Sequence, residues 1–357
     1  MAEDNALEAR LADREYLRPP TDFVGQANVT DPDIYEVFDS NYPEAFEQYA
    51  ALLDWDEHWD AVLDDSDPPF YRWFSGGRLN ASTNCIDRHL DERKNQTALL
   101  WEGEDGETER IAYQDLYRRV NEMSGVLRQV GVREDDVVTL HLPMLPALPV
   151  TMLSCARIGA PHSEVFAGFS ASALADRIDD AGSDVVVTVD GYYRRGEFIN
   201  HKQKADQALD EADSDVDTVL LWTRHDDLHP DVEIDEDDPY VLVDDLLAEN
   251  EGIEISPVSR DAEDPLFLMY TSGTTGKPKG CQHRTGGYLA YVTATSKYVL
   301  DIDPEDTYWC AADIGWITGH SYIVYGPLAL GTTSVMYEGA PDHPHKGRIW
   351  EIAERYD

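Results

Sequence analysis

Lysine is scarce in this sequence, and paired cysteines and long apolar runs are missing. Seven of the 357 residues are lysine against 21 arginines, and 28 basic against 71 acidic residues give a formal charge of 28 − 71 = −43. Such acidity disfavours nucleic acid and anionic membranes as partners, since both attract basic surfaces. The four cysteines show no CxxC spacing, which argues against a zinc site or disulfide framework. Without a signal peptide or an 18-residue apolar run, we expect a soluble, cytoplasmic protein.

The acidic residues are spread over the whole length rather than gathered in a tail. Together with scarce lysine and evident core segments, this composition is typical of proteins adapted to high salt. Self-repulsion should destabilise the fold in dilute buffer, and we expect structure to be lost below roughly 1 M salt, where screening weakens. The rival interpretation is an intrinsically disordered acidic chain, but 10% aromatic residues and strong apolar periodicity argue against it.

From about residue 95 the chain alternates strand-like apolar runs with helical patterns, which predicts an α/β fold with a largely parallel sheet. The predicted strands are 97–101, 110–112, 137–142, 185–189, 218–222, 266–269, 307–311 and 332–336. The predicted helices are 113–130, 146–158, 171–181, 200–211, 241–249, 285–300, 322–330 and 346–356. Before this region, residues 1–30 are polar and expected to be flexible, and residues 33–63 show helical apolar spacing.

The most informative stretch is YTSGTTGKPKG, residues 270–280, which follows an apolar run and precedes the helix predicted from Thr285. A strand, a glycine-rich loop and a helix form a phosphate-binding arrangement. Glycines allow close approach to an anion, backbone N–H groups surround its oxygens, and hydroxyls and lysines add donors. The candidate phosphate ligands are Thr271, Ser272, Gly273, Thr274, Thr275, Gly276, Lys277 and Lys279.

The spacing of this loop differs from that of a Walker A motif. Only two residues separate Gly273 from Gly276, and Pro278 rather than Ser or Thr follows the lysine, so a P-loop kinase or GTPase is disfavoured. An ordinary surface loop is the remaining alternative. Four hydroxyls, three glycines and two lysines rarely coincide after a buried strand, which argues against that alternative.

The loop resembles the phosphate-loop signature of acyl-adenylate-forming enzymes, which activate a carboxylate with ATP as an acyl-AMP. The segment 73–90 is similar to the N-terminal cap of acetyl-CoA synthetases within that superfamily. The resemblance implies a flexible segment 1–30, a cap region 31–92 and a partial AMP-binding domain 93–357. It also implies a layered α/β fold with mainly parallel sheets, truncated before its C-terminal part. The family's hinge and C-terminal domain are expected to lie outside this chain.

A second informative stretch, Asp313–Ser321, lies at the exit of a predicted strand, where ligands bind in α/β sheets. Trp316 offers a flat wall beside the short Thr318, which suits a small acyl pocket; a core tryptophan is the alternative. The stretch is similar to the acetyl-CoA synthetase pattern. That resemblance implies that Trp316 and Ile317 limit acyl length and that Thr318 contacts coenzyme A (CoA).

A third stretch, Arg194-Arg195-Gly196-Glu197, is similar to a family segment that binds CoA. The planar guanidinium suits CoA phosphates, although two surface arginines are the plain alternative. Glu197 stands where the best-known bacterial pattern has another arginine, and Asp342 stands where the family often has asparagine. Both changes add negative charge near an anionic ligand, so weak or salt-dependent CoA binding is expected.

Taken together, the resemblance implies an AMP-forming acetate–CoA ligase acting on ATP, acetate and CoA. Mg²⁺ is expected as a cofactor with its ligands outside this chain, and no catalytic residue is expected within it. A propionate or other short-chain acyl-CoA ligase is one alternative. Another is a truncated, inactive remnant that binds nucleotide or CoA, or that pairs with a separately encoded C-terminal half.

Overall fold

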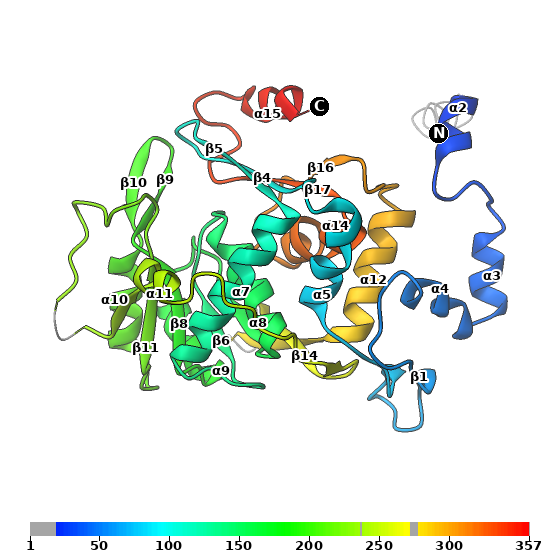
Figure 1. Cartoon of the computed structure of the whole chain (residues 1–357), viewed down its shortest axis with the longest axis horizontal. Helices are drawn as coiled ribbons and strands as arrows, with labels where there is room; N and C mark the ends of the chain where they lie inside the picture. The colour runs from blue at the N-terminus through cyan, green and yellow to red at the C-terminus, as the bar shows by residue number, and fades with distance from the viewer. Residues whose placement is uncertain (1–18, 236–237, 272–277, 357) are drawn as a thin grey trace, which may run out of the picture.

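Two parallel-rich sheets with helices between and around them form the body of the protein in the computed structural model (Figure 1), which describes residues 19–235, 238–271 and 278–356. The larger sheet contains β6 (Val138–Leu140), β7 (His162–Glu164), β8 (Val185–Val189), β11 (Thr218–Trp222), β12 (Tyr240–Leu242), β14 (Pro265–Thr271) and β15 (Lys279–Arg284). Its order is β12-β11-β8-β6-β7-β14-β15, and all neighbours are parallel except β14 and β15.

The smaller sheet contains β4 (Thr97–Glu102), β5 (Thr108–Ala112), β16 (Thr307–Trp309) and β17 (Thr333–Tyr337). Its order is β16-β17-β4-β5, and only β4 and β5 are antiparallel. Three two-stranded ribbons add β1 (Ala61–Asp64) with β2 (Arg72–Ser75), β3 (Arg78–Leu79) with β13 (Arg260–Asp261), and β9 (Gly191–Arg194) with β10 (Glu197–Asn200). The expected α/β class with mainly parallel sheets is confirmed.

Helices separate and cover the two sheets. The main ones are α7 (Tyr113–Gln129), α8 (Ala147–Ile158), α9 (Ala171–Ala181), α10 (Lys202–Glu211), α11 (Val243–Glu249), α12 (Thr285–Tyr298), α14 (Gly326–Leu330) and α15 (Arg348–Tyr356). The pair α9 and α10 packs on one face of the larger sheet, α7 and α8 lie in the core between the sheets, and α15 packs against the smaller sheet. No helix in the described part of the chain is long and apolar enough to cross a bilayer.

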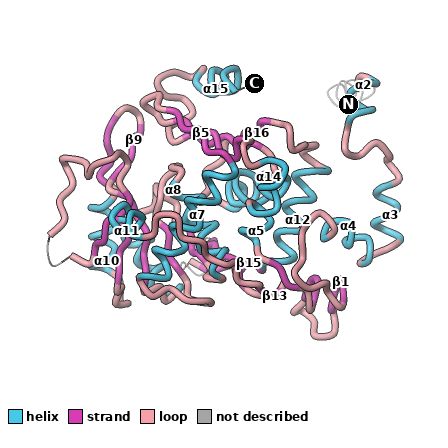
Figure 2. The backbone as a smooth tube through the Cα atoms, viewed as in Figure 1, coloured by secondary structure: helices cyan, strands magenta, loops and turns pink. Residues whose placement is uncertain are grey.

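The shorter helices are α2 (Thr21–Gln26), α3 (Ile34–Ser40), α4 (Glu47–Ala50), α5 (Ala81–Cys85), α6 (Leu90–Arg93) and α13 (Ile317–Gly319). Figure 2 shows α2 and α3 at one side of the molecule, joined to it by loops. After α13 the chain continues through a π-helical segment, His320–Tyr325, into α14.

Helix ends follow local signals in the sequence. Ser170 accepts a hydrogen bond from the Ala173 N–H and caps α9, as its position predicted. Gly159 and Gly182 end α8 and α9 with φ of +77° and +61°, a backbone region that glycine enters without a Cβ penalty. These ends aim the following strands back into the larger sheet.

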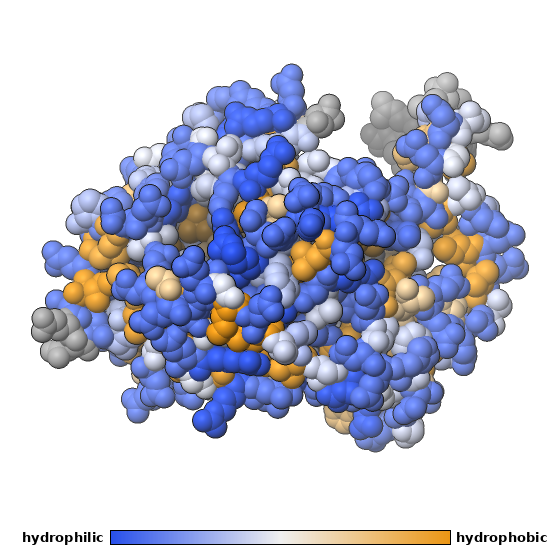
Figure 3. Space-filling model, in the orientation of Figure 1, coloured by the Kyte–Doolittle hydropathy of each residue, from blue (hydrophilic) through white to orange (hydrophobic). Residues whose placement is uncertain are grey.

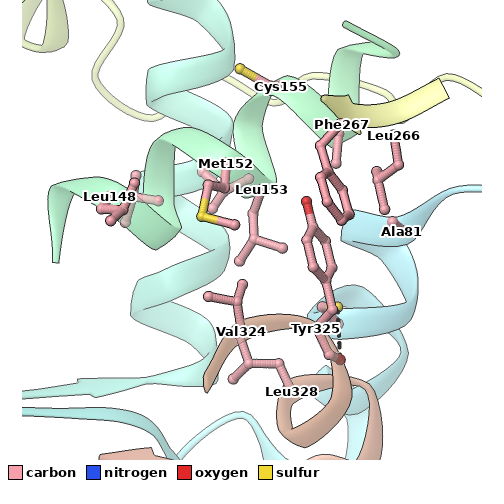
Figure 4. Close-up of a cluster of buried hydrophobic side chains, with 14 of the residues drawn as sticks. Ala81, Leu148, Met152, Leu153, Cys155, Leu266, Phe267, Val324, Tyr325 and Leu328 are labelled. Carbon is pink, nitrogen blue, oxygen red and sulfur yellow. Dashed lines mark hydrogen bonds between the residues drawn. The ribbon is translucent and has the colours of Figure 1, made fainter. Parts of the chain in front are cut away.

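The centre of the core joins α8, β14 and the helical run after residue 317. Figure 4 shows Leu153, Phe267 and Tyr325 meeting there. The Tyr325 side chain is fully buried, and its hydroxyl lies 2.9 Å from Nε2 of His162 on β7. This contact satisfies a polar group inside an apolar cluster and ties the small helices to the larger sheet. On the face drawn in Figure 3 the surface is mostly hydrophilic, with scattered apolar patches.

Two sequence-based expectations are wrong. The helical spacing of residues 33–63 gives only α3 and α4 with a short 3₁₀ turn, and the chain then turns into β1. Pro43, which lacks an N–H donor, interrupts the helical pattern. The chain also does not pass from the glycine-rich loop directly into a helix, because β15 intervenes before α12. This edge strand is polar and largely exposed, so it lacks the apolar alternation that reveals a strand.

Candidate functional site

Most of the candidate residues that the structure describes lie just beyond the carboxyl ends of parallel strands, where open α/β sheets bind ligands. The arginine segment follows β8, the segment containing Trp316 follows β16, and Asp342 follows β17. The first segment belongs to the larger sheet and the other two to the smaller one. Contacts across this edge bring parts of both sheets into one site.

Arg195 and Gly196 form the two-residue turn of the β9–β10 hairpin. Their φ values of +56° and +81° fit the primed turns that connect such hairpins. Arg195 Nη2 lies 2.9 Å from Asp342 Oδ1, and this hydrogen bond lowers the pKa of the Asp342 carboxyl. The structure therefore places three of the predicted CoA residues together and gives the charge of Asp342 a partner. Glu197 is exposed and lies opposite Arg194 in the ribbon.

A narrow cavity of about 90 Å³ lies beside this turn. Arg194 lines it together with Asp313 and Glu338. Burial raises the pKa of Asp313, although the Gly315 N–H and the charge of Arg194 act in the opposite direction. Asp313 Oδ1 accepts the Gly315 N–H at 2.8 Å, which shapes the chain just before Trp316. The cavity thus connects the arginine turn to the predicted acyl segment.

Trp316 is not a core tryptophan, so that alternative is wrong. Its side chain is 47% exposed, and its ring lies 5.5 Å from the ring of Phe166 and 5.8 Å from that of Phe169, centroid to centroid. Ile317 is 40% exposed, and Thr318 beside it is also exposed. Trp316 therefore has one side fixed by aromatic contacts and part of its surface available to a ligand.

A column of side chains leads from Trp316 to the phosphate-loop strand. The Arg177 guanidinium lies 4.7 Å from the Phe169 ring centroid and 5.2 Å from that of Tyr270, the penultimate residue of β14. Arg177 is 6% exposed and comes from α9. Sequence reasoning missed it, because an arginine on an amphipathic helix is typically a surface residue.

The structure describes only the ends of the glycine-rich loop. Thr271 and Lys279 are cross-strand partners in the β14–β15 hairpin, and both are exposed. The other predicted phosphate ligands, Ser272, Gly273, Thr274, Thr275, Gly276 and Lys277, lie outside the described residues. In residues 19–235, 238–271 and 278–356 no group of three or more His, Cys, Asp or Glu side chains fits a metal ion.

Sequence reasoning also missed a buried ion-pair network between the two sheets. Arg224, which follows β11, is 9% exposed and donates Nε and Nη2 to the two carboxylate oxygens of Glu338 at 2.9 and 2.8 Å. Its Nη1 donates to Glu107 at 2.8 Å. These partners raise the pKa of Arg224 despite the opposing effect of burial. Charged residues in turns are typically solvated, so no sequence signal distinguished this set.

A further missed residue is Glu164, at the end of β7. It is 3% exposed, and within the described part of the chain neither carboxyl oxygen has a hydrogen-bond partner. Burial raises its pKa well above the usual range, and the charge of Asp313 raises it further. Burial without donors therefore favours the neutral form of Glu164, at the end of the strand that leads to the Trp316-contacting Phe166.

Comparison with known proteins agrees with this architecture. The model of the AMP-binding enzyme family matches residues 86–357. The chain belongs to the AMP-binding enzyme family. The model of the acetyl-coenzyme A synthetase N-terminus matches residues 32–85, a segment that contains α3, α4, the β1–β2 ribbon, β3 and α5.

Similar proteins include three named acetyl-coenzyme A synthetase. The protein from Gemmatimonas aurantiaca is 45% identical over 98% of this chain and 54% of its own length. That from Wolinella succinogenes is 44% identical over 96% of this chain and 53% of its own. That from Pyrobaculum aerophilum is 47% identical over 88% and 48%. The chain thus spans about half the length of these curated relatives.

Proposed function

We propose that this chain carries the substrate-binding half of an AMP-forming acetate–CoA ligase, a cytoplasmic enzyme adapted to high salt. Its cap would comprise residues 31–92 and its partial AMP-binding domain residues 93–357. The observation that carries the proposal is the convergence of Arg194, Asp313 and the 338–342 loop on one cavity at the carboxyl ends of two sheets. The names of the similar proteins support acetate and CoA as substrates.

The proposed reaction has two steps. An acetate oxygen attacks the α-phosphorus of ATP, the bond to pyrophosphate breaks, and acetyl-AMP forms. The CoA thiol then attacks the acetyl carbon, its proton passes to solvent, and AMP leaves. Mg²⁺ supplies charge neutralisation on the ATP phosphates when it is bound.

The described residues have distinct roles in this proposal. Thr271 and Lys279, with the loop between them, bind the ATP phosphates by preorganised hydrogen bonds and charge. Trp316 and Ile317 close the acyl pocket and limit chain length. Arg194 and Arg195, with Gly196, Glu197 and Asp342 around them, bind the CoA phosphates, and Thr318 contacts CoA nearby. None of these residues is assigned the chemical step.

Acetate-dependent exchange of labelled pyrophosphate into ATP tests the activity. The chain is assayed in molar KCl, alone and with a separately produced C-terminal half of a similar protein. We expect exchange in the mixture with acetate and far less with propionate. Preference for propionate would replace acetate as the substrate. Absence of exchange in both assays, together with retained CoA or nucleotide binding, would instead support an inactive binding protein.

A further inference from the structure

Three segments that are far apart in sequence meet at the side chain of Glu104. Oε1 of this residue accepts the Gly196 N–H at 2.7 Å, and Oε2 accepts the Ala340 N–H at 2.8 Å. Gly196 belongs to the arginine turn, and Ala340 lies two residues before Asp342. One carboxylate therefore joins the two parts of the chain that carry the proposed CoA residues.

Glu104 is an unusual residue for the β4–β5 turn because it is only 8% exposed. Burial by itself raises the pKa of its carboxyl, but backbone N–H groups of Ala340, Gly196 and Arg195 outweigh that effect and hold the pKa below its usual value. Hydrogen bonds to an ionised acceptor are shorter and stronger than those between neutral groups. The geometry thus favours an ionised Glu104 carboxylate at neutral pH, with one hydrogen bond accepted by each oxygen.

The backbone on both sides is shaped for this contact. A Cβ on Gly339 would lie 2.4 Å from the Tyr337 hydroxyl and 2.9 Å from Glu104 Cβ, so glycine permits the close approach of the 338–342 loop. The positive φ of Gly196 directs its N–H in the tight turn.

A second carboxylate supports the first. Glu338 accepts the Glu104 N–H and the Tyr193 N–H, each at 3.3 Å, while Arg224 holds it from the other side. The β9–β10 hairpin is therefore tied at its tip by Glu104 and at its side by Glu338. Neither carboxylate can bind a phosphate itself, since an ionised carboxylate only accepts hydrogen bonds and the oxygens of both are directed at protein donors.

We propose that Glu104 is a positioning residue for CoA binding, which fixes the Arg194–Arg195 turn against the 340–342 loop. This inference rests on the proposed function. With the turn fixed, Arg194 stays at the cavity and Arg195 stays beside Asp342. Preorganised guanidinium groups bind phosphate without a further ordering cost, whereas a detached hairpin must be ordered by the ligand itself.

The two carboxylate oxygens give a specific set of variants. Glu104→Gln replaces one acceptor with an N–H₂ group that opposes a backbone N–H. Glu104→Asp keeps the charge but is one methylene too short to reach both donors. Glu109→Gln is the matched control, because it removes the same charge from the same β-hairpin at a partly exposed ion pair with Arg119.

Calorimetric titration of the 357-residue chain with CoA, and separately with ATP, in molar KCl tests the proposal. We expect both Glu104 variants to weaken CoA binding about tenfold, the factor for one lost hydrogen bond to a charged group, with ATP binding unchanged. Glu109→Gln should bind both ligands as the unmodified chain does. Equal loss of CoA and ATP affinity, or no loss of CoA affinity, would overturn the positioning role.

Amide hydrogen exchange at Gly196 and Ala340 in the unliganded chain gives an independent readout. We expect faster exchange at both amides in the Glu104 variants and not in Glu109→Gln. Unchanged amide exchange at Gly196 and Ala340 in the Glu104 variants would overturn the inference, whatever the CoA affinity of these variants. If the unmodified chain binds no CoA while the exchange difference is present, the proposed CoA function fails and Glu104 is a hairpin clamp without that role. If Glu104→Gln does not fold, Glu104→Asp carries both measurements.

Discussion

Two buried carboxyl groups at the same edge of the molecule have pKa values shifted in opposite directions. Glu104, between the two sheets, accepts two backbone N–H groups, and its pKa is held below the usual value. Glu164, at the end of β7, has no partner among the described residues, and its pKa is raised well above the usual value. Burial alone acts in the same direction on both. The donors that the fold supplies decide the direction in which each pKa shifts.

The same contrast extends to the basic groups around each carboxyl. Arg224 in the inter-sheet network is paired with Glu338 and Glu107 and remains charged. His141, after β6, is fully buried with neither ring nitrogen bonded to a described residue, and its ring stacks on that of His201 at 3.9 Å. Burial lowers the pKa of His141 well below the usual value, and the charges of His201 and Lys204 lower it further. The region around Arg224 is thus stabilised by paired charges, whereas the buried His141 ring is accommodated in its neutral form.

Removal of salt should have the largest effect, because it acts on both regions through the net charge of −43. On dialysis from molar KCl into dilute buffer, we expect loss of the far-ultraviolet circular dichroism signal below roughly 1 M salt. A spectrum that does not change would contradict the expected adaptation to high salt. The midpoint salt concentration of this transition can also be compared between variants. The contrast becomes sharper if Arg224→Met raises that midpoint more than Glu164→Gln or His141→Phe does.

Arg224→Met should be the most damaging single substitution. It leaves the Glu338 carboxylate buried without its bidentate partner, and breaking such a pair costs about 3–5 kcal/mol of unfolding free energy. Denaturant unfolding in molar KCl measures the loss. Arg119→Met, which breaks the partly exposed pair with Glu109, should cost at most about 1 kcal/mol. Similar losses in both variants would show that the inter-sheet pair is solvated.

Glu164→Gln should stabilise the protein at neutral pH by about 1–3 kcal/mol, since it removes a carboxyl that is costly to ionise in its site. Because the folded-state pKa lies above the usual value of 4.5, the stability that neutral Glu164 permits is fully present below pH 4.5 and is lost as the pH rises through the folded pKa. The difference between variant and unmodified chain should therefore grow above pH 4.5.

Unfolding free energy measured across this pH range, with the exposed Glu251→Gln as control, tests that expectation. A difference that is constant with pH would mean that Glu164 ionises as readily in the folded as in the unfolded chain. The pKa of Glu164 would then not be raised, and the two carboxyl groups would no longer shift in opposite directions.

His141→Phe should have the smallest effect, confined to the acid side. The folded-state pKa of His141 lies below the usual value of 6.5, so stability from the neutral ring is present above pH 6.5 and is lost as the pH falls. Within this window the unfolding free energy of the unmodified chain falls by about 1.4 kcal/mol per pH unit. Near pH 6 this loss is about 0.7 kcal/mol, and the variant should not show it. Thermal unfolding between pH 6 and 8 measures this slope. The exposed His58→Phe should leave the slope unchanged, and an equal slope in all three proteins would show that His141 protonates freely in the fold.

Elements governed by local signals could be predicted from the sequence. The range 171–181 of α9 follows from its apolar spacing, the Ser170 cap and Gly182, and the range 185–189 of β8 follows from a run of β-branched residues. Elements whose stability depends on a neighbouring strand were missed. The polar edge strand β15 forms because β14 supplies its hydrogen-bond partners, a signal that its own residues do not contain.

The candidate site divides in the same way. The residue types and spacing of the glycine-rich loop, the Arg194-Arg195 pair and the Trp316 segment indicated phosphate and acyl recognition without any structure. By itself, the sequence determined the α/β class, the family resemblance and these three segments, because periodicity and motif spacing are local properties. Only the tertiary structure decided that the pKa of buried Glu104 is lowered while that of buried Glu164 is raised, because the donors to Glu104 come from segments distant in sequence and none of the described residues donates to Glu164.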